Sequence, residues 1–215
     1  VAALSHQRAA AAQAAGLFDD EIVTVSVPQR RGEPLLVTAD EGIRPDTTVE
    51  SLAGLRAAFA EGGTITAGNS SQISDGASAV VVTTRALAAE KGWPVLVTVG
   101  ASGQTAGPDN SLQAQPARAI ERACEKQGIS PSDLDLVEIN EAFGAVVARS
   151  QVELGLDPAL VNIHGGGIAI GHPIGASGNR LVVHLAHELA RRGSGTAAVG
   201  LCGGGGQGEA LILTR

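Results

Sequence analysis

Apolar and polar residues follow two different spacings along this chain, and together they predict both strands and helices. Short apolar runs between turn residues are typical of buried strands, and apolar residues every three or four positions are typical of helices with one buried face. The predicted strands cover residues 22–27, 76–82, 95–99, 134–139, 161–163, 196–201 and 210–213. The predicted helices cover residues 2–15, 52–59, 86–91, 117–127 and 177–192, and another begins after Asn140.

The first third of the chain differs in character from the rest. Residues 16–71 are rich in loops, whereas regular elements follow one another from Asp75 onward. The chain begins with Val1 rather than Met, and residues 2–15 have the pattern of an Ala-rich helix already in progress, which Gly16 closes. We therefore expect the sequence to start within a helix of a longer protein.

Composition limits the classes of function. Hydrophobic residues make up 44% of the 215 residues, aromatic residues only 2%, and 29 residues are glycine, which favours a globular core of small, closely packed elements. The net charge of −7 and the pI of about 5.2 argue against nucleic-acid binding, because little would neutralise phosphates. No apolar run reaches the roughly 18 residues that span a bilayer, and no signal peptide is visible, so we expect a cytoplasmic protein without a membrane partner.

The two cysteines call for separate explanations. Cys124 and Cys202 give no disulfide framework, and no second Cys or His stands at a metal-ligand spacing, so no metal site is expected. Cys124 lies on the apolar face of its predicted helix and is expected to point into the core. Cys202 directly follows a predicted strand and precedes the glycine-rich residues 203–208.

Polar groups at three predicted strand ends are candidates for catalysis: Asn140, His172 and Cys202. Functional groups of α/β sheets gather at the carboxyl ends of strands. Each residue also has a structural interpretation, because Asn140 could cap the next helix, His172 could be an ordinary turn residue, and Cys202 could be a small buried apolar residue. None of the three decides between these alternatives alone.

The glycines around Cys202 favour the catalytic interpretation. A substrate can approach a thiol that is flanked by backbone without side chains, and successive backbone N–H groups can bind a developing oxyanion. A free thiol has a pKa of about 8.5 and can exchange protons if a neighbour such as His172 assists. The glycines at 165–167 lack the spacing of a dinucleotide fingerprint, and no phosphate-loop Lys follows. These features favour a thioester ligand.

Three motifs in one order make the sequence resemble the thiolases. They are Asn-Glu-Ala-Phe at residues 140–143, Gly-His-Pro-Ile-Gly-Ala-Ser-Gly at 171–178, and Leu-Cys-Gly-Gly-Gly-Gly-Gln-Gly at 201–208. Residues 5–9 resemble the helix of the family's loop domain, and residues 66–71 with 74–77 resemble its turn that contacts coenzyme A (CoA). The resemblance covers nearly the whole chain.

The resemblance implies an α/β fold and a division into three parts. Residues 1–73 would be the rear part of the loop domain, and residues 74–94 the closing strand and helix of the N-terminal core half. Residues 95–215 would form the C-terminal core half, with a mixed five-stranded sheet between helices. The N-terminal segment that carries the family's nucleophilic cysteine lies outside these residues, as does a loop-domain His. Cys124 cannot replace that nucleophile, because it should face inward.

The resemblance also assigns roles to the candidate residues. Cys202 would exchange a proton with the acetyl-CoA carbon, and His172 would activate the nucleophile. A water held by Asn140 would, with His172, stabilise the thioester oxyanion, and the Gly204 N–H would contribute to a second oxyanion hole. The implied substrate-binding residues are Arg44 at the adenine and phosphate end of CoA, Ser51, Phe59 and Ser71 along the pantetheine, and Leu112 and Phe143.

Some positions depart from the family pattern or have a simpler explanation. Leu112 stands where many short-chain thiolases have Met, and Gln72 where Gly is common, so the acyl length remains open. His164 replaces a frequent Asn, and we expect a structural or rim role for it. Arg44 by itself would be interpreted as a solvated surface charge.

The implied activity of the intact enzyme is that of an acetyl-CoA C-acetyltransferase, which condenses two acetyl-CoA or cleaves acetoacetyl-CoA with CoA. CoA would be a substrate, no cofactor is expected, and the full-length enzyme would be a homodimer or homotetramer. One alternative is a 3-ketoacyl-CoA thiolase for longer chains in fatty-acid β-oxidation. Another is a CoA-binding fragment without catalysis, which is how we expect the isolated chain to behave. Sequence upstream of Val1 would distinguish the last alternative.

Overall fold

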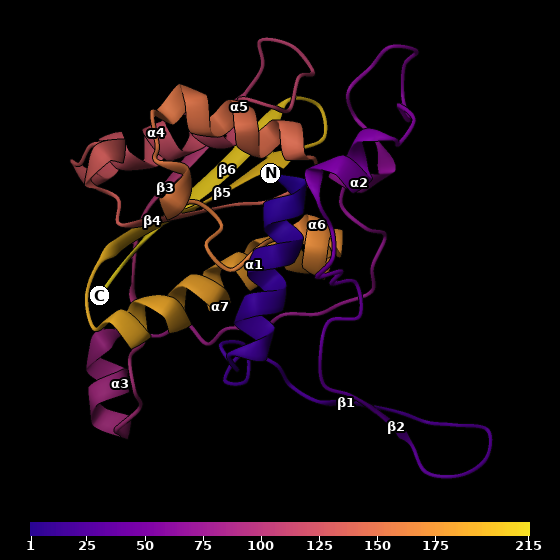
Figure 1. Ribbon diagram of the computed structural model, residues 1–215. Coiled ribbons are helices and arrows are strands. Elements are labelled where there is room, and N and C mark those ends of the chain that lie inside the picture. The colour runs from indigo at the N-terminus through magenta and orange to yellow at the C-terminus, as the bar shows by residue number, and fades with distance from the viewer.

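A computed structural model describes residues 1–215 and shows a four-stranded mixed sheet with helices on both faces (Figure 1). Its strands are β3 (Thr98–Ala106), β4 (Leu136–Ile139), β5 (Thr196–Gly203) and β6 (Gln207–Thr214), in the order β3-β6-β5-β4. β4 and β5 run parallel, whereas β6 is antiparallel to both of its neighbours. The expected α/β class is therefore confirmed, although the number of strands differs.

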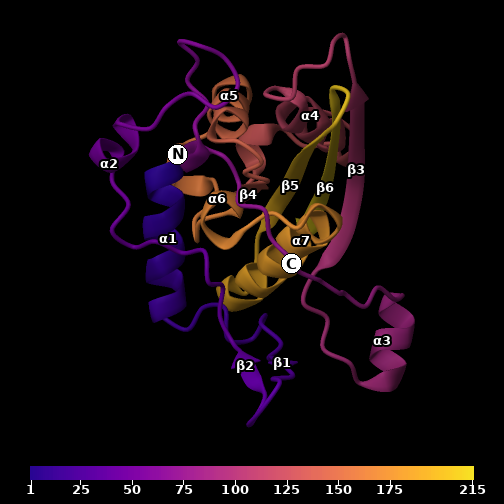
Figure 2. The same cartoon turned by 90° about the vertical axis from the view of Figure 1, so that its right-hand side faces the viewer.

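Helices cover the two faces of the sheet (Figure 2). On one face α4 (Gln115–Gln127) and α5 (Gly144–Leu154) pack over a cluster that includes Ile120 and Ile139. On the other face α7 (Ile174–Arg192) packs Leu181, Leu185 and Leu189 against the sheet, as their four-residue spacing predicts. Burying one such leucine contributes about 1.5–3 kcal/mol, so this helix is held chiefly by its apolar face.

The fifth strand expected at residues 161–163 is reduced to a single parallel bridge between Val161 and Val137. Asn162 has a φ of 48°, in the left-handed region, which turns the chain away from the sheet. Its side chain bonds both backbone groups of Ile139, accepting from the N–H at 2.8 Å and donating to the C=O at 2.8 Å. A side-chain amide thus takes the place of the missing backbone ladder.

The prediction of a buried strand at residues 76–82 is wrong. These residues form no strand, and Val81 and Val82 are 83% and 72% exposed. The segment is attached to the core by side chains instead, with Asn179 Nδ2 of α7 donating to Ser78 Oγ at 2.7 Å. An apolar run becomes a strand only where another strand accepts its hydrogen bonds, and none lies beside this one.

Other predicted elements are present with changed limits. The strand predicted at 95–99 begins later and forms β3, and the one at 22–27 survives only as β1 (Val25–Val27), paired with β2 (Leu35–Val37) in an exposed hairpin. The helix predicted at 52–59 is α2 (Val49–Ala53), which begins at a capping box of Thr48 and Ser51. The helix at 86–91 is α3 (Arg85–Lys91). Short 3-10 turns occupy Ala67–Asn69, Pro131–Asp133 and Pro158–Leu160.

The first third of the chain is attached to the core by α1 (Ala2–Ala14). This helix lies beside the short α6 (Gly167–Ile170), which leads into α7 (Figure 1). The Arg8 guanidinium donates to the backbone carbonyls of Pro158, Val161 and Asn162 at 2.7–3.2 Å. α1 is thereby fixed against the loop that follows α5. No helix in the structure is both long and apolar enough to cross a bilayer.

Candidate active site

Asn140 and Cys202 lie at the same edge of the sheet. β4 and β5 are parallel neighbours, Ile139 stands opposite Gly200, and the Asn140 N–H donates to the Gly200 carbonyl at 2.9 Å. Cys202 follows two residues later on β5. The carboxyl ends of these two strands therefore deliver both candidates to one edge, as expected for functional groups of an α/β sheet.

His172 is brought to Asn140 by the turn between α6 and α7. The chain bends at Gly171, whose φ of 97° is in the region that favours glycine. The Asn140 Nδ2 lies 3.2 Å from His172 Nε2, and His172 Nδ1 lies 2.6 Å from Ser177 Oγ. Burial, together with the charge of Arg180, lowers the pKa of His172, so the ring is neutral near pH 7.

Cys202 approaches this edge from the other side of the sheet. Its half-buried side chain packs at the margin of the α4–α5 cluster, as do Leu112 and Phe143, whereas Leu201 lies against Gly178 in α7. No hydrogen bond joins the thiol to Asn140 or His172. Burial raises the pKa of the Cys202 thiol, which favours a protonated thiol over a resident thiolate.

The glycine-rich turn after Cys202 is accessible at Gly204 and tightly packed at Gly206. A Cβ added at Gly204 would meet nothing, so its exposed backbone can be approached by a ligand. Gly206 has a φ of 76° and lies directly against the Asp109 carbonyl, where no side chain fits. The turn is therefore fixed at Gly206 while Gly204 remains open.

Cys124 is buried in the α4–α5 cluster, which confirms its expected orientation. Burial raises the pKa of this thiol too, with the charges of Asp133 and Glu121 acting in the same direction. A buried protonated thiol has neither the access nor the thiolate character that a nucleophile needs.

The substrate-binding candidates fall into two groups. Phe59 stands edge-on to Phe143, with ring centroids 5.8 Å apart, and the Ser71 N–H donates to the Ala142 carbonyl at 3.0 Å. These contacts place both beside the segment that follows Asn140. The other group is farther out along the loop. The Ser51 Oγ serves the cap of α2, accepting from Thr48 N–H at 3.0 Å, and Arg44 is exposed, with its backbone N–H donating to His6 Nδ1 at 3.1 Å.

A hollow of about 400 Å³ is lined by Leu55, Arg56, Ala57, Ala58 and Ala67. It faces the loop between α2 and the 3-10 turn Ala67–Asn69, on the same part of the chain as Phe59 and Ser51. The loop thus offers a mostly apolar surface with one arginine in its lining.

Sequence comparison identifies the family. The family model described as "Thiolase, C-terminal domain" matches residues 93–215, and "Thiolase, N-terminal domain" matches residues 1–86. This chain belongs to the thiolase family. The order of the Asn140, His172 and Cys202 motifs is therefore a family order, and the resemblance inferred from them is confirmed.

Thiolase relatives match the whole chain but only about half of their own length. A "Probable acetyl-CoA acetyltransferase" of Mycolicibacterium smegmatis is 60% identical over 214 residues, covering 100% of this chain and 55% of that protein. An "Acetyl-CoA acetyltransferase" of Pseudomonas aeruginosa is 50% identical over 215 residues, covering 100% of this chain and 54% of that protein.

Solved thiolase structures share the fold. The crystal structure of the Bacillus anthracis acetyl-CoA acetyltransferase has a TM-score of 0.96 at 41% identity and covers 100% of this chain and 54% of that one. A human mitochondrial 3-ketoacyl-CoA thiolase in complex with CoA has a TM-score of 0.92 at 40% identity and covers 100% and 53%. The expected thiolase fold is confirmed.

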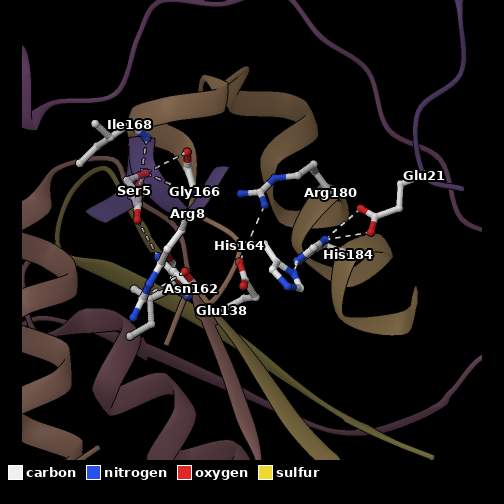
Figure 3. Close-up of polar contacts among 12 residues, drawn as sticks. Ser5, Arg8, Glu21, Glu138, Asn162, His164, Gly166, Ile168, Arg180 and His184 are labelled. Carbon is white, nitrogen blue, oxygen red and sulfur yellow. Dashed lines mark hydrogen bonds and ion pairs between the residues drawn. The ribbon is translucent and has the colours of Figure 1, made fainter. Parts of the chain in front are cut away.

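Sequence analysis assigned no role to Glu141, whose hydrogen bonds connect several elements next to Asn140. Its buried carboxylate accepts hydrogen bonds from Ser5 Oγ, from Asn162 Nδ2 at 3.0 Å and from the Ile168 N–H at 3.1 Å (Figure 3 shows Ser5, Asn162 and Ile168). α1, β4 and α6 are thereby joined one residue after Asn140. The only sequence signal was a carboxylate inside the Asn-Glu-Ala-Phe motif, because its partners are distant in sequence.

Two of the three departures from the family pattern, Gln72 and His164, have structural roles. The Gln72 Nε2 donates to the carbonyls of Ile168 and Ala169 at 2.9 Å each, and to Gly42 at 3.1 Å, so it supports α6. His164 Nδ1 lies 3.1 Å from His184 Nε2 (Figure 3). Burial, with the charge of His184, lowers the pKa of His164 to about 4. The expected structural role of His164 agrees with these contacts.

Glu138 is a buried carboxyl group beneath the site, on the α7 face of β4 (Figure 3). Its Oε2 lies 3.8 Å from Arg180 Nη1 and makes no hydrogen bond, and Arg180 Nη2 has no partner either. Burial raises the pKa of Glu138 to about 7, the nearby carboxylates Glu141 and Glu21 add to the rise, and the charges of His184 and Arg180 oppose it. With this pKa, Glu138 is largely the neutral acid below pH 7.

We expect Glu138→Gln to become more stable relative to wild type as the pH rises from about 5 to 8. The unfolded Glu138 ionises near 4.5, so its stabilising contribution is complete below that pH and is lost as the pH rises through about 7. The gain should be on the order of 3 kcal/mol in the free energy of unfolding. Urea unfolding at both pH values measures it.

Glu209→Gln is the matched control for this experiment, since Glu209 is exposed on β6 and reports the loss of one surface charge. A difference between Glu138→Gln and wild type that stays constant with pH, or that shifts in favour of wild type as the pH rises, would contradict a neutral buried acid.

Proposed function

We propose that these residues form part of an acetyl-CoA C-acetyltransferase, which condenses two acetyl-CoA or cleaves acetoacetyl-CoA with CoA. The observation that carries the proposal is the contact between Asn140 Nδ2 and His172 Nε2, which are 3.2 Å apart. This contact lies at the edge of the sheet where Cys202 stands near the end of β5. The names of the bacterial relatives support the same reaction. CoA, acetyl-CoA and acetoacetyl-CoA are the proposed ligands, and a homodimer or homotetramer is the proposed assembly of the complete protein.

The first half of the proposed reaction transfers an acetyl group to a cysteine thiol from the N-terminal part of the enzyme. His172 Nε2 takes the proton of that thiol, the thiolate attacks the thioester carbon, and CoA leaves as a thiol after it receives a proton. The buried Oδ1 of Asn140 has no protein partner, and it can therefore hold the water that helps to bind the oxyanion.

The second half forms the carbon–carbon bond. His172, neutral again once it has protonated CoA, takes the proton of the Cys202 thiol. The resulting Cys202 thiolate takes a proton from the methyl carbon of a second acetyl-CoA, and the enolate attacks the acetyl group on the nucleophile. The bond to the nucleophilic sulfur breaks, this sulfur receives the proton from His172, and acetoacetyl-CoA is released. The raised thiol pKa of Cys202 makes it a strong base once deprotonated, and the accessible Gly204 backbone is placed to donate to the oxyanion.

A second candidate is a 3-ketoacyl-CoA thiolase for longer acyl chains. Its support is the human mitochondrial 3-ketoacyl-CoA thiolase, which superimposes with a TM-score of 0.92. Leu112 lies at the margin of the α4–α5 cluster, as do Phe143 and Cys202, so its size bears on the room for an acyl chain. Comparing rates with acetoacetyl-CoA and longer 3-ketoacyl-CoA distinguishes the two in the complete enzyme.

We expect Arg44→Ala to weaken binding of CoA to this chain without changing the binding of pantetheine. Arg44 is exposed and would contact the phosphate and adenine end, which pantetheine lacks. An exposed ion pair contributes about 1 kcal/mol, so the dissociation constant for CoA should rise roughly fivefold. Isothermal titration of the chain with each ligand measures the difference.

Arg122→Ala is the control, because this exposed arginine of α4 already pairs with Glu125 at 3.0 Å. Equal losses for CoA and pantetheine, or no loss for either, would count against the assignment of Arg44. A chain that binds neither ligand would count against CoA contacts within these 215 residues.

A further inference from the structure

Ser177 stands beneath His172 in the first turn of α7 and is buried. Its hydroxyl group donates to the Pro173 carbonyl at 2.9 Å, four residues back in the chain. A hydroxyl has one hydrogen, so the oxygen of Ser177 can only accept from its other neighbour. That neighbour is His172 Nδ1 at 2.6 Å, which must therefore carry a proton.

The Asn140 amide does not decide the tautomer. Its Nδ2 lies 3.2 Å from His172 Nε2 and 3.5 Å from Nδ1, so it faces the ring between the two nitrogens and not along either electron pair. A neutral imidazole has one N–H and one acceptor nitrogen, so the proton that the Ser177 contact assigns to Nδ1 leaves Nε2 as the acceptor.

We propose that Ser177 is a positioning residue that fixes His172 as the Nδ1–H tautomer and leaves the electron pair of Nε2 directed at the edge of the sheet. The lowered pKa of His172 agrees, because a neutral ring is required.

The catalytic meaning of this arrangement rests on the proposed function. Nε2 is the atom that would take the proton of the nucleophilic thiol, and only the Nδ1–H tautomer can do so without first losing a proton. The tautomer itself is a property of the folded chain. It can be measured whether or not the thiolase reaction takes place.

The test is a long-range ¹H–¹⁵N correlation spectrum of the ¹⁵N-histidine-labelled chain at about pH 8, above the usual histidine range. His172→Gln identifies the His172 signals among those of the five histidines. In the unmodified chain we expect Nδ1 to resonate as a protonated nitrogen and Nε2 as an unprotonated one. In Ser177→Ala we expect this pattern to be lost, with both nitrogens moving toward exchange-averaged positions.

Ser150→Ala is the matched control, because Ser150 is also a buried helical serine whose hydroxyl donates to a carbonyl, that of Gln113 at 3.0 Å. It should leave the His172 signals unchanged. A proton on Nε2 in the unmodified chain would overturn the proposal, whether or not Ser177→Ala folds. An Nδ1–H pattern that persists in Ser177→Ala would overturn it as well. Absence of thiolase activity would leave these spectra unaffected and would count only against the proposed function.

Discussion

These 215 residues on their own should not turn over acetoacetyl-CoA with CoA above the uncatalysed rate. Covalent acyl transfer needs an accessible nucleophile. Of the two thiols, Cys124 is buried in the core, and Cys202 is the proposed proton-transfer group, with a thiol pKa that burial raises. Activity should appear when the residues that precede the matching region in the Mycolicibacterium smegmatis relative are joined upstream of Val1. The measurement is the loss of acetoacetyl-CoA absorbance with time.

Two variants of the isolated chain make this prediction decisive. If the isolated chain turned over the substrate, Cys202→Ala abolished that turnover and Cys124→Ala left it unchanged, Cys202 would be the nucleophile and its proposed role would be wrong. Turnover that disappeared only in Cys124→Ala would require the core to open. A silent isolated chain with an active joined chain is the expected outcome.

Cys202→Ala in the joined, active chain should reduce condensation of acetyl-CoA about 100- to 10,000-fold, the range for loss of one positioned proton-transfer group. Acetylation of the nucleophile should be affected much less, because that step depends on His172 and not on a proton at carbon. Rapid labelling with acetyl-CoA measures the first step, and steady-state condensation measures the whole reaction.

Cys124→Ala is the control, since it removes a thiol of the same size from the core cluster and not from the edge of the sheet. It should cost stability and leave the ratio of the two rates unchanged. Equal, modest losses of acetylation and condensation in Cys202→Ala would argue against a base at this position and favour a packing role beside Leu112 and Phe143.

The regular elements of the C-terminal half were predictable because their local signals agree with their burial. In α7, Leu181, Leu185 and Leu189 repeat every turn and all three reach the sheet. α4 ends at Gly128, whose φ of 77° is one that glycine adopts readily. Such signals lie within one element and depend little on the rest of the fold.

Pairing between strands was not predictable in the same way. Residues 76–82 have the composition of a buried strand, yet Val81 is exposed, because a strand also needs a neighbour to accept its hydrogen bonds. At residues 161–163 the left-handed Asn162 and its bonds to Ile139 replace the ladder. Both outcomes depend on partners far away in the sequence.

By itself the sequence determined the α/β class, the thiolase family and the candidates Asn140, His172 and Cys202, since each follows from a local pattern or from motif order. The tertiary structure alone decided that Asn140 meets His172, that Glu141 joins α1 to α6, and that the Ser177 hydroxyl contacts Nδ1 of the imidazole ring. The physical reason is that hydrogen-bond direction depends on which donors and acceptors the fold brings within about 3 Å of each other. Spacing along the chain carries no record of that proximity.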